Sequence, residues 1–501
     1  MDDQNRNLIL ATALSFLVIL VWFLLFPPEE PPAPVTDPEA AAESSTPALP
    51  GADGGTGGAA AIPGTGSQTT EEALAAVERF DIETPRLTGS ISLTGGRIDD
   101  LHLSDYRVTL DPDADTVTLL KPEGTAGAYY ALFGWAPGPG LDNELVPGRD
   151  TEWSREGSGA LTPGEDAVLT WNNGAGLEFR RIFTVDEDYM FTVRQEVTNT
   201  TDAPVRLAPY GLIARHGLPD DLMGFFIIHE GAIRQTGEEL NEYSYNNLED
   251  MDPVEGWGPA ADVKEVAGNG WVGFTDHYWM TTLIPASEEP FKAALQWDPR
   301  SNIYQTTALL DTKEVGPGQT VSVDQQLFAG AKEWEAIRAY ERDDGVYRFI
   351  DSIDWGWFFF LTKPIFAVLH WLNGLIGNMG WAIIGLTFLI KALLLPLAYK
   401  SYVSMARMKE LQPEMEKIKE RAGDDRQKLQ QEMMALYKER KVNPAAGCLP
   451  ILLQIPIFFA LYKVLFVTIE MRHAPFFGWI QDLSAPDPSS IYNLWGVFPW
   501  T

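Results

Sequence analysis

The chain contains several apolar runs long enough to cross a lipid bilayer, and these runs constrain its fold more than any other feature. The first, Leu8 to Phe26 (LILATALSFLVILVWFLLF), has 19 residues without a charge, close to the roughly 20 that a spanning helix needs. It ends in Phe-Pro-Pro-Glu-Glu, whereas a cleaved signal peptide has a shorter apolar core and a small-residue cleavage site. We therefore predict a retained membrane anchor.

Three further apolar segments lie near the C-terminal end: Trp355–Ile376, Met379–Tyr399 and Ala445–Ile469. Between the last two, the 49 residues from Ala398 to Ala446 contain 11 Lys and Arg, against 21 in the 328 residues from Pro27 to Asp354. Short segments rich in Lys and Arg stay in the cytoplasm. The basic segment is therefore predicted to be cytoplasmic, and the long segment that follows the anchor to lie outside.

The segment Trp355–Ile376 is predicted not to cross the membrane. If it crossed, the basic segment would end up outside, against the positive-inside rule. Lys363-Pro364 interrupts the segment, and its tryptophans suit the headgroup region better than the hydrocarbon. We expect a helix that lies along the outer interface.

Between the anchor and these segments, the sequence indicates a flexible tether and then a β-domain. Residues Pro27 to about Thr70 are rich in Pro, Ala, Gly, Ser and Thr, a composition typical of disordered linkers. From Phe80 to about Lys332, strand-like runs such as ISLTGGRIDDLHL alternate with turn signals. We expect a large, mainly antiparallel sandwich, followed by a short charged helical stretch, KEWEAIRAYERDDGVYRFID.

The composition argues against several classes of function. The single cysteine, Cys448, excludes an internal disulfide, and the six histidines do not fall at metal-ligand spacing. A net charge of −33 argues against nonspecific nucleic-acid binding. The sequence has no GxxxxGK[ST], GxSxG or HExxH motif. We therefore expect no catalytic residues, no metal, no cofactor and no specific nucleic-acid partner.

The basic segment between the last two apolar runs is predicted to form an antiparallel helical hairpin. Its apolar residues recur at 4/3 spacing in two arms, on either side of Gly423-Asp424-Asp425. Asp424 is predicted to cap the second arm, with Gln427 three residues on, and Pro413 to break or restart the first arm. Either a partner-docking role or ordinary solvated structure would fit this pattern.

Lys391 lies in the middle of an apolar run, GLTFLIKALLLPL. It is ten residues after Trp381, roughly 15 Å along a helix and so near the bilayer centre. Placing a lysine there costs about 2.5–3.5 kcal/mol, and its stem is too short to reach Tyr399 at the interface. Because neither later span contains Asp or Glu, we expect a water-filled cavity around Lys391.

Two other polar side chains are predicted to share this cavity. Thr387 precedes Lys391 by one helical turn, and Gln454 lies at comparable depth in the other span. Pro450 and Pro456 each remove a backbone hydrogen bond, which predicts a kinked helix there. Lys463 is near the outer end and is interpreted as structural, with its amine reaching the interface.

The sequence resembles the YidC-type membrane protein insertases over nearly its whole length. The residues that carry the resemblance are QQEMMALYKERKVNPAAGCLPILLQIPIFFALYKVLFVTIEMRHAPFFGWIQDLSAPDP, WAIIGLTFLIKALLLPLAYKSYVSMARMKELQP, TPRLTGSISLTGGRIDDLHLSDYR and GWVGFTDHYW. The last two are similar to the Gram-negative branch, which carries a large periplasmic domain. The resemblance implies a multidomain fold: a polytopic α-helical domain in the bacterial inner membrane and a periplasmic antiparallel β-supersandwich related to sugar-binding folds.

The resemblance also fixes the predicted segments. In chain order these are a cytoplasmic N-terminus (1–7), transmembrane helix 1 (8–26), a disordered periplasmic linker (27–75), the β-supersandwich domain (76–350), a periplasmic interfacial amphipathic helix (351–377), transmembrane helix 2 (378–400), a cytoplasmic helical hairpin (401–443), transmembrane helix 3 (444–469) and a periplasmic segment (470–501).

The function that the resemblance implies needs no active site. Such insertases transfer hydrophobic segments of newly made proteins from the cytoplasm into the inner membrane through a hydrophilic groove, alone or with the Sec translocon. By resemblance, the groove's basic residue is Lys391, and Thr387, Gln454 and Tyr402 line it. The implied partners are nascent membrane proteins, the Sec translocon and its accessory subunits, the ribosome near the hairpin, and membrane lipids.

The sequence departs from the family's pattern in two places. The family usually has arginine where this chain has Lys391; lysine keeps the charge but lacks the bidentate fork. Family members also have three further transmembrane helices after the DLSAPDP region, and these are expected to complete the groove.

Two other functions fit part of the sequence. A membrane-anchored carbohydrate-binding or mutarotase-like module would need a His and Asp/Glu pair in a cleft of the β-domain, with His102, His216, His229 and His277 as candidates. A transporter fits less well, because the later spans lack internal repeats.

Overall fold

The structure is a computed structural model that describes residues 68–225, 227–423, 425–440, 442–443, 447 and 449–485. The predicted transmembrane helix over residues 8–26, the linker before residue 68, Cys448 and the end of the predicted segment 470–501 lie outside the described residues. The first described helix, α2 (Thr70–Ala75), falls inside the predicted linker and begins with a capping box formed by Thr69 and Glu72.

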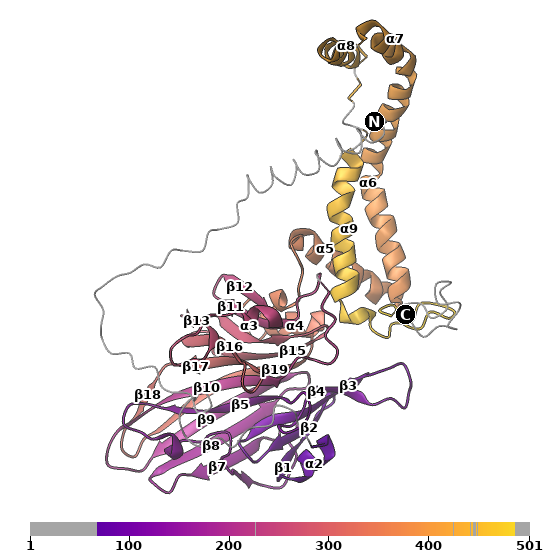
Figure 1. The fold of residues 1–501 in the computed structure, drawn as a ribbon. Coiled ribbons are helices and arrows are strands. Elements are labelled where there is room, and N and C mark those ends of the chain that lie inside the picture. Colours follow the sequence, from indigo (N-terminus) through magenta and orange to yellow (C-terminus); the bar gives the residue numbers. More distant parts are fainter. Residues whose placement is uncertain are drawn as a thin grey trace, which may run out of the picture. The chain divides into compact units, whose positions relative to one another are not determined.

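The β-domain is a sandwich of two antiparallel sheets, as predicted (Figure 1). The ten-stranded sheet runs β1-β2-β3-β5-β10-β17-β16-β13, with β4 beside β3 and β18 beside β10. Its strands are β1 (Arg79–Glu83), β2 (Leu87–Ser92), β3 (Arg97–Arg107), β4 (Thr116–Leu120), β5 (Tyr129–Pro137), β10 (Val205–His216), β13 (Ala260–Val266), β16 (Phe291–Asp298), β17 (Ile303–Leu310) and β18 (Lys313–Val315).

The second sheet has nine strands in the order β12-β11-β14-β15-β19-β9-β8-β7-β6. They are β6 (Ser154–Glu156), β7 (Ala167–Asn172), β8 (Leu177–Val185), β9 (Met190–Asn199), β11 (Gly231–Thr236), β12 (Glu239–Ser244), β14 (Gly270–Thr275), β15 (Trp279–Pro285) and β19 (Thr320–Ala331). Two short helices, η1 (Asn143–Leu145) and α3 (Tyr245–Glu249), lie in the connections.

The main hydrophobic core lies between the two sheets, and β5 shows how the sequence builds it. Alternate residues of a strand point to opposite faces. On β5, Tyr129, Phe133 and Trp135 belong to the main core, whereas Tyr130 and Leu132 belong to a second cluster on the outer face of the same sheet. All nine residues of β5 are buried. This two-sided burial explains the continuous aromatic run YYALFGWAP.

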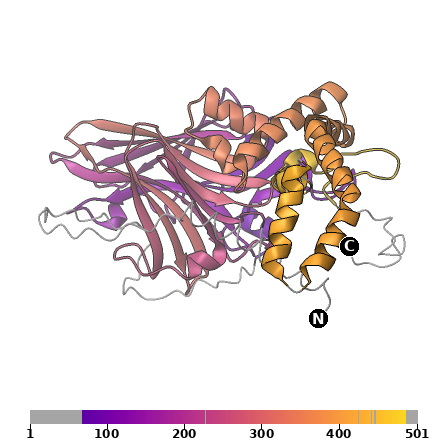
Figure 2. The same ribbon diagram turned by 90° about the horizontal axis from the view of Figure 1, so that it is seen from above.

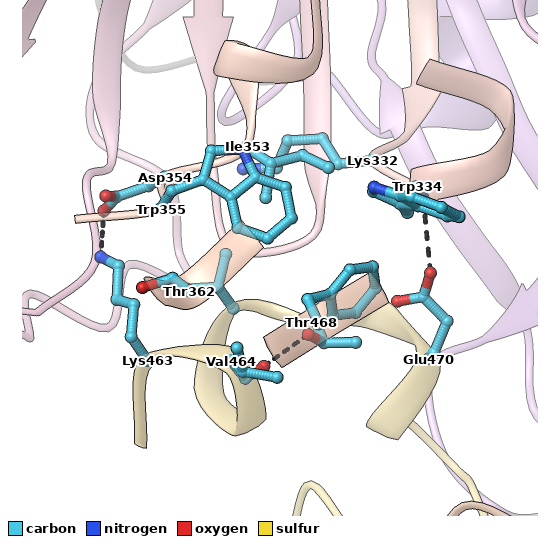
Figure 3. A pocket seen from close by; sticks show the side chains of 12 residues that line it. Lys332, Trp334, Ile353, Asp354, Trp355, Thr362, Lys463, Val464, Thr468 and Glu470 are labelled. Carbon is cyan, nitrogen blue, oxygen red and sulfur yellow. Dashed lines mark hydrogen bonds and ion pairs between the residues drawn. The ribbon is translucent and has the colours of Figure 1, made fainter. Parts of the chain in front are cut away.

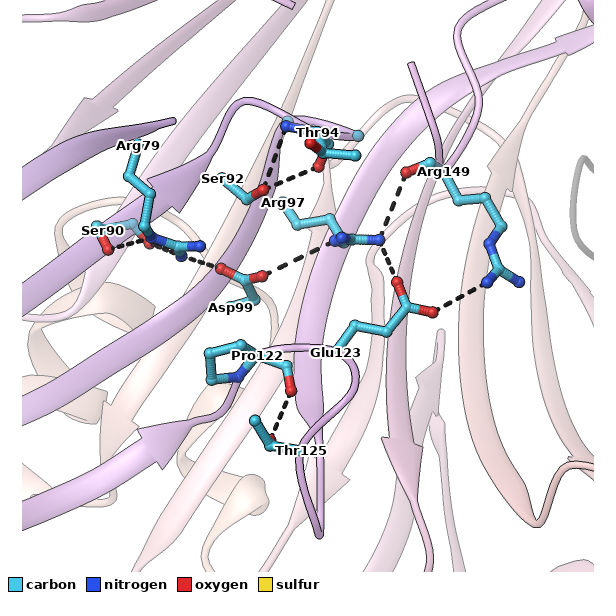
Figure 4. A network of polar contacts seen from close by, with 12 residues as sticks. Arg79, Ser90, Ser92, Thr94, Arg97, Asp99, Pro122, Glu123, Thr125 and Arg149 are labelled. Atoms are coloured by element: carbon cyan, nitrogen blue, oxygen red, sulfur yellow. Dashed lines mark hydrogen bonds and ion pairs between the residues drawn. The ribbon is translucent and has the colours of Figure 1, made fainter. Parts of the chain in front are cut away.

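One group of buried and half-buried charges in the β-domain is paired in a chain. Figure 4 shows a chain of alternating charges in which Arg79 pairs with Asp99, Arg97 lies between Asp99 and Glu123, and Arg149 pairs with Glu123. The Nη2 atom of Arg149 lies 3.1 Å from Oε1 of Glu123. Such pairing offsets the cost of removing charges from water.

The predicted charged helical stretch forms α4 (Trp334–Arg342) and the 3₁₀ helix η2 (Phe349–Ser352). The remaining helices are α5 (Phe359–Ile376), α6 (Met379–Glu410), α7 (Gln412–Ala422), α8 (Arg426–Glu439), α9 (Leu449–Val467) and the 3₁₀ helix η4 (Ile469–Met471). Figures 1 and 2 show α6 and α9 side by side, with α7 and α8 at the end of α6 far from α5.

Helix α5 packs across one end of the α6–α9 pair. Its buried residues Phe366, Leu369 and Leu372 share a cluster with the first turns of α6 and the last turns of α9. Its polar contacts go to the β-domain: Nε2 of His370 lies 2.8 Å from Oε1 of Glu335 in α4. By length and composition alone, α5, α6 and α9 are each able to span a membrane. The packing of α5 distinguishes it from the other two.

Candidate functional site

Helix α6 is longer than the predicted span. Asn378 caps its start by accepting a hydrogen bond from the Trp381 N–H at 3.1 Å. The helix then continues for 32 residues, about 48 Å, and passes the predicted boundary at residue 400. The second predicted span and the beginning of the predicted hairpin are therefore one continuous helix.

Lys391, Thr387 and Tyr402 lie on one face of α6. At about 100° per residue, Thr387 is about 40° and Tyr402 about 20° from Lys391 around the helix axis. All three are exposed. The buried residues Ala382 and Leu386 pack on the opposite side, in the cluster with α5 and α9. The Lys391 face therefore points away from the packed interior.

Lys391 makes no hydrogen bond or ion pair within the part of the chain that the structure describes. The Thr387 hydroxyl donates to the Ile383 carbonyl at 2.9 Å, a bond inside its own helix that leaves the hydroxyl oxygen available as an acceptor. The face thus offers one cation and polar oxygen atoms to whatever approaches it.

Gln454 lies exposed on α9. It lies on the neighbouring helix, and among the described residues no hydrogen bond joins it to Lys391 or Thr387. Pro456 is inside α9. Pro450 is the second residue of α9 as described, and the residues that would accept from this position, including 446, lie outside the described residues.

Lys463 has a very different environment. Its Nζ lies 2.5 Å from Oδ2 of Asp354 and donates to the Ile227 carbonyl; the side chains of Lys463 and Asp354 are only 12% and 16% exposed. Asp354 also accepts hydrogen bonds from the backbone N–H groups of His229 at 2.9 Å and Gly356 at 3.1 Å. Figure 3 shows this pair at a pocket between α9, α5 and the β-domain. Lys463 is therefore structural, as predicted, but its amine pairs with Asp354 and does not extend to the interface.

Burial shifts the pKa of two other groups that line the same pocket. The pKa of Lys332 falls to about 8 because burial disfavours its charge, and Asp276 and Asp354 oppose this shift. The pKa of Glu470 rises to about 7, again through burial, while the Trp334 N–H opposes the shift. The pocket is small, with room for roughly one water molecule. It is a packed junction and not a ligand site.

The basic segment forms the predicted antiparallel hairpin. Nη2 of Arg440 lies 2.6 Å from Oε1 of Glu414, so the end of α8 meets the beginning of α7. Pro413 falls in the first turn of α7, after α6 ends at Glu410, as predicted. The cap of α8 is Asp425, which accepts from the N–H groups of Gln427 and Lys428. The prediction of Asp424 as this cap is wrong by one residue, and Asp424 itself lies outside the described residues.

The four candidate histidines do not converge on one cleft. His102 is flanked by Asp100 at 3.0 Å, two residues away on the same strand, and by Thr118 at 3.1 Å. His229 and His277 contact backbone carbonyls, those of Ala232 and Phe466. Burial lowers the pKa of His216. Within the described residues, no group of three His, Cys, Asp or Glu side chains is arranged to hold a metal ion.

The fold and these helices define a membrane protein that carries a large β-sandwich domain outside the bilayer. The chain matches the family model of the YidC periplasmic domain over residues 79–368 and that of the 60Kd inner membrane protein over residues 371–500. A membrane protein insertase YidC from Roseobacter denitrificans is 59% identical over 503 residues, which cover 100% of this chain and 82% of that relative.

The chain therefore belongs to the YidC family of membrane protein insertases. It is an inner-membrane protein with a periplasmic domain; its substrates are nascent membrane proteins, and it is not an enzyme.

Two solved structures are similar at much lower sequence identity. The crystal structure of an active YidC insertase is 18% identical, with a TM-score of 0.29, and the match covers 83% of this chain and 78% of that one. A galactose mutarotase-related enzyme from Lactobacillus acidophilus is 12% identical, with a TM-score of 0.34, over 50% of this chain and 97% of its own. The mutarotase-like alternative is not favoured, because the relatives of high identity are named membrane protein insertases.

Proposed function

We propose that this insertase passes hydrophobic segments along a hydrophilic groove whose basic residue is Lys391, with Thr387, Tyr402 and Gln454 along its walls. One observation supports this most strongly: among the described residues Lys391 is exposed and has no partner, whereas Lys463 is buried against Asp354. A cation at mid-bilayer is costly unless water or a counter-ion reaches it. A groove open to water and to substrate would supply the water, and an acidic residue of the substrate would supply the counter-ion.

The charge of Lys391 explains how the groove could attract a substrate and then release it. A cation in surroundings of low dielectric constant attracts acidic residues in the tail of an incoming protein. The tail is released when the apolar segment that follows it leaves the groove for lipid, because transfer of apolar surface out of water is favourable. Lysine acts here as a point charge, without the fixed two-point geometry of arginine.

The rest of the proposed topology is supported by the packing and the charges, and the proposed partners by membership of the insertase family. The hairpin of α7 and α8 lies on the cytoplasmic side, where it receives the substrate near the ribosome, and the protein works alone or beside the Sec translocon and its accessory subunits. Helix α5 lies along the outer interface, a placement supported by its packing across the ends of α6 and α9 and by its bonds to the β-domain.

Substitution of Lys391 tests this proposal. We expect Lys391→Glu to reduce the insertion of a single-spanning protein with an acidic tail at least about tenfold, because a repulsive charge replaces an attractive one. Lys391→Arg should insert the same substrate nearly as well as the parent protein. The measurement is protease protection in reconstituted vesicles, with a substrate that has a neutral tail as the control. Equal insertion by both variants would contradict the electrostatic proposal.

A further inference from the structure

The loop between β10 and β11 is an unusually apolar part of the β-domain surface. Residues Leu222 to Ile228 read LMGFFII, and Phe226 lies outside the described residues. Leu222 packs against the main core, whereas the side chain of Met223 is 49% exposed. Two acidic residues, Asp220 and Asp221, precede this apolar run.

This loop lies beside the outer end of α9. Lys463 donates a hydrogen bond to the Ile227 carbonyl, and the rings of Phe225 and Phe466 are 5.3 Å apart. Lys463 precedes the last residue of α9, Val467, by four positions, about 6 Å of helix. The loop therefore descends to the depth of the last turn of a membrane helix.

The loop is held in this position by a set of hydrogen bonds. The buried carboxylate of Glu230 accepts from the N–H groups of Met223 at 3.3 Å and Gly224 at 3.0 Å. The Ile228 N–H donates to the Phe225 carbonyl at 2.9 Å. These bonds hold the backbone of Met223 and Gly224 against Glu230, so the exposure of Met223 belongs to a hydrogen-bonded part of the loop.

The surface around the loop is apolar as well. The side chain of Trp357 is 88% exposed, and the rings of Phe358 and Phe459 are 6.3 Å apart. A Cβ built on Gly356 would lie 3.3 Å from Cε of Lys463, which shows how closely this segment approaches α9. The loop and the segment before α5 therefore both contact α9, and each exposes a large apolar side chain, Met223 and Trp357 respectively. Exposed tryptophan is typical of the membrane interface.

We propose that the loop Leu222–Ile228 is a membrane-contact loop through which the periplasmic domain touches the outer leaflet, with Met223 against lipid. The exposed apolar residues of α9 would face acyl chains, and the loop contacts the last turns of that helix, so its exposed apolar side chain would meet the same phase. Apolar contact, not charge, makes this interaction, because Asp220 and Asp221 would repel anionic headgroups. This role is independent of the groove at Lys391.

A spin label at residue 223 tests the proposal in nanodiscs of phosphatidylethanolamine and phosphatidylglycerol. The only cysteine, Cys448, is replaced by serine, and Met223→Cys carries the label. The matched control is Ala175→Cys, an exposed residue in the β7–β8 turn near the opposite edge of the second sheet. Power saturation compares collisions with oxygen, which concentrates in lipid, and with a nickel chelate, which stays in water.

We expect the label at 223 to collide at least about threefold more with oxygen relative to nickel than the label at 175. The ratio should fall to that of the control when the protein is moved from nanodiscs into a lipid-free amphipathic polymer. Equal ratios at the two positions in nanodiscs would overturn the proposal. That result would also be expected if the natural occupant of this surface were another protein.

Discussion

In the β-domain, Arg181 is fully buried and donates to the carbonyls of Gly95 and Gly96 at 3.0 Å and to that of Phe133. In α6, Lys391 is exposed and makes no such bond within the described residues. The first region encloses this charge and binds both its terminal nitrogens with backbone carbonyls. The second presents a charge that only an outside group can satisfy. The comparison distinguishes a structural charge in the β-domain from a charge on α6 that is available to a substrate.

The largest expected effect comes from removing the enclosed charge. Burial lowers the pKa of Arg181 to about 9, and a Cβ on Gly96 would lie 2.5 Å from its Nη1, so the guanidinium fills its space closely. We predict that Arg181→Ala destabilises the β-domain by about 3 kcal/mol, through a cavity and unpaired carbonyls. Urea unfolding measures the loss.

The neighbouring residue provides the control for this comparison. Arg180 is half exposed, and its two ion pairs, with Glu156 and Glu196, are 3.5 Å long. Exposed pairs of this kind contribute little, so Arg180→Ala should change the free energy of unfolding by no more than about 0.5 kcal/mol. Similar losses for the two variants would show that the β-domain does not depend on its enclosed charges.

A smaller effect is expected from the two lysines of the apolar helices. Lys463→Met should leave Asp354 buried without its counter-ion and weaken the attachment of the 222–230 loop by about 2 kcal/mol, or about 30-fold in its opening equilibrium. Lys391→Met should leave that loop unchanged. Hydrogen exchange at the His229 N–H, which is bonded to Asp354, measures both.

A double variant separates charge from packing. Asp354→Asn combined with Lys463→Met leaves no unpaired charge, so its loop should exchange more slowly than that of Lys463→Met alone. If Lys391→Met loosened the loop as much as Lys463→Met, the distinction between a paired and an unpaired lysine would be wrong.

Local patterns in the sequence predicted much of this structure. The apolar runs predicted helices α5, α6 and α9, because about 20 predominantly apolar residues have few other stable arrangements in a membrane protein. Alternating residues such as LEFRRIFTV in β8 predicted strands, and their burial alternates accordingly. The 4/3 apolar spacing predicted the hairpin. Its one error is the cap of α8, which is Asp425 and not the neighbouring Asp424.

The contacts that the sequence could not predict are those between distant segments. Asp354 was missed as the partner of Lys463 because it precedes an apolar segment that was read only as membrane interface. The depth of Lys463 was estimated along its own helix, which says nothing about a β-domain packed beside it. The pairing of the two sheets likewise depends on the whole chain. The groove residues on α6 share a face by helical geometry alone, whereas the position of Gln454 relative to them depends on how two helices pack.

The central claim is that a nascent segment approaches the Lys391 face of α6. A photoreactive amino acid at Thr387 tests it directly, with one at Leu393 as the matched control. Leu393 is 80% exposed at a similar depth, but about 160° from Lys391 around the helix. We predict that a ribosome-stalled, single-spanning chain crosslinks at least about fivefold more from position 387 than from 393, and that Lys391→Glu reduces this crosslink for an acidic tail. Equal or stronger crosslinking from 393 would contradict the account, because the substrate would then follow the face of the helix opposite Lys391.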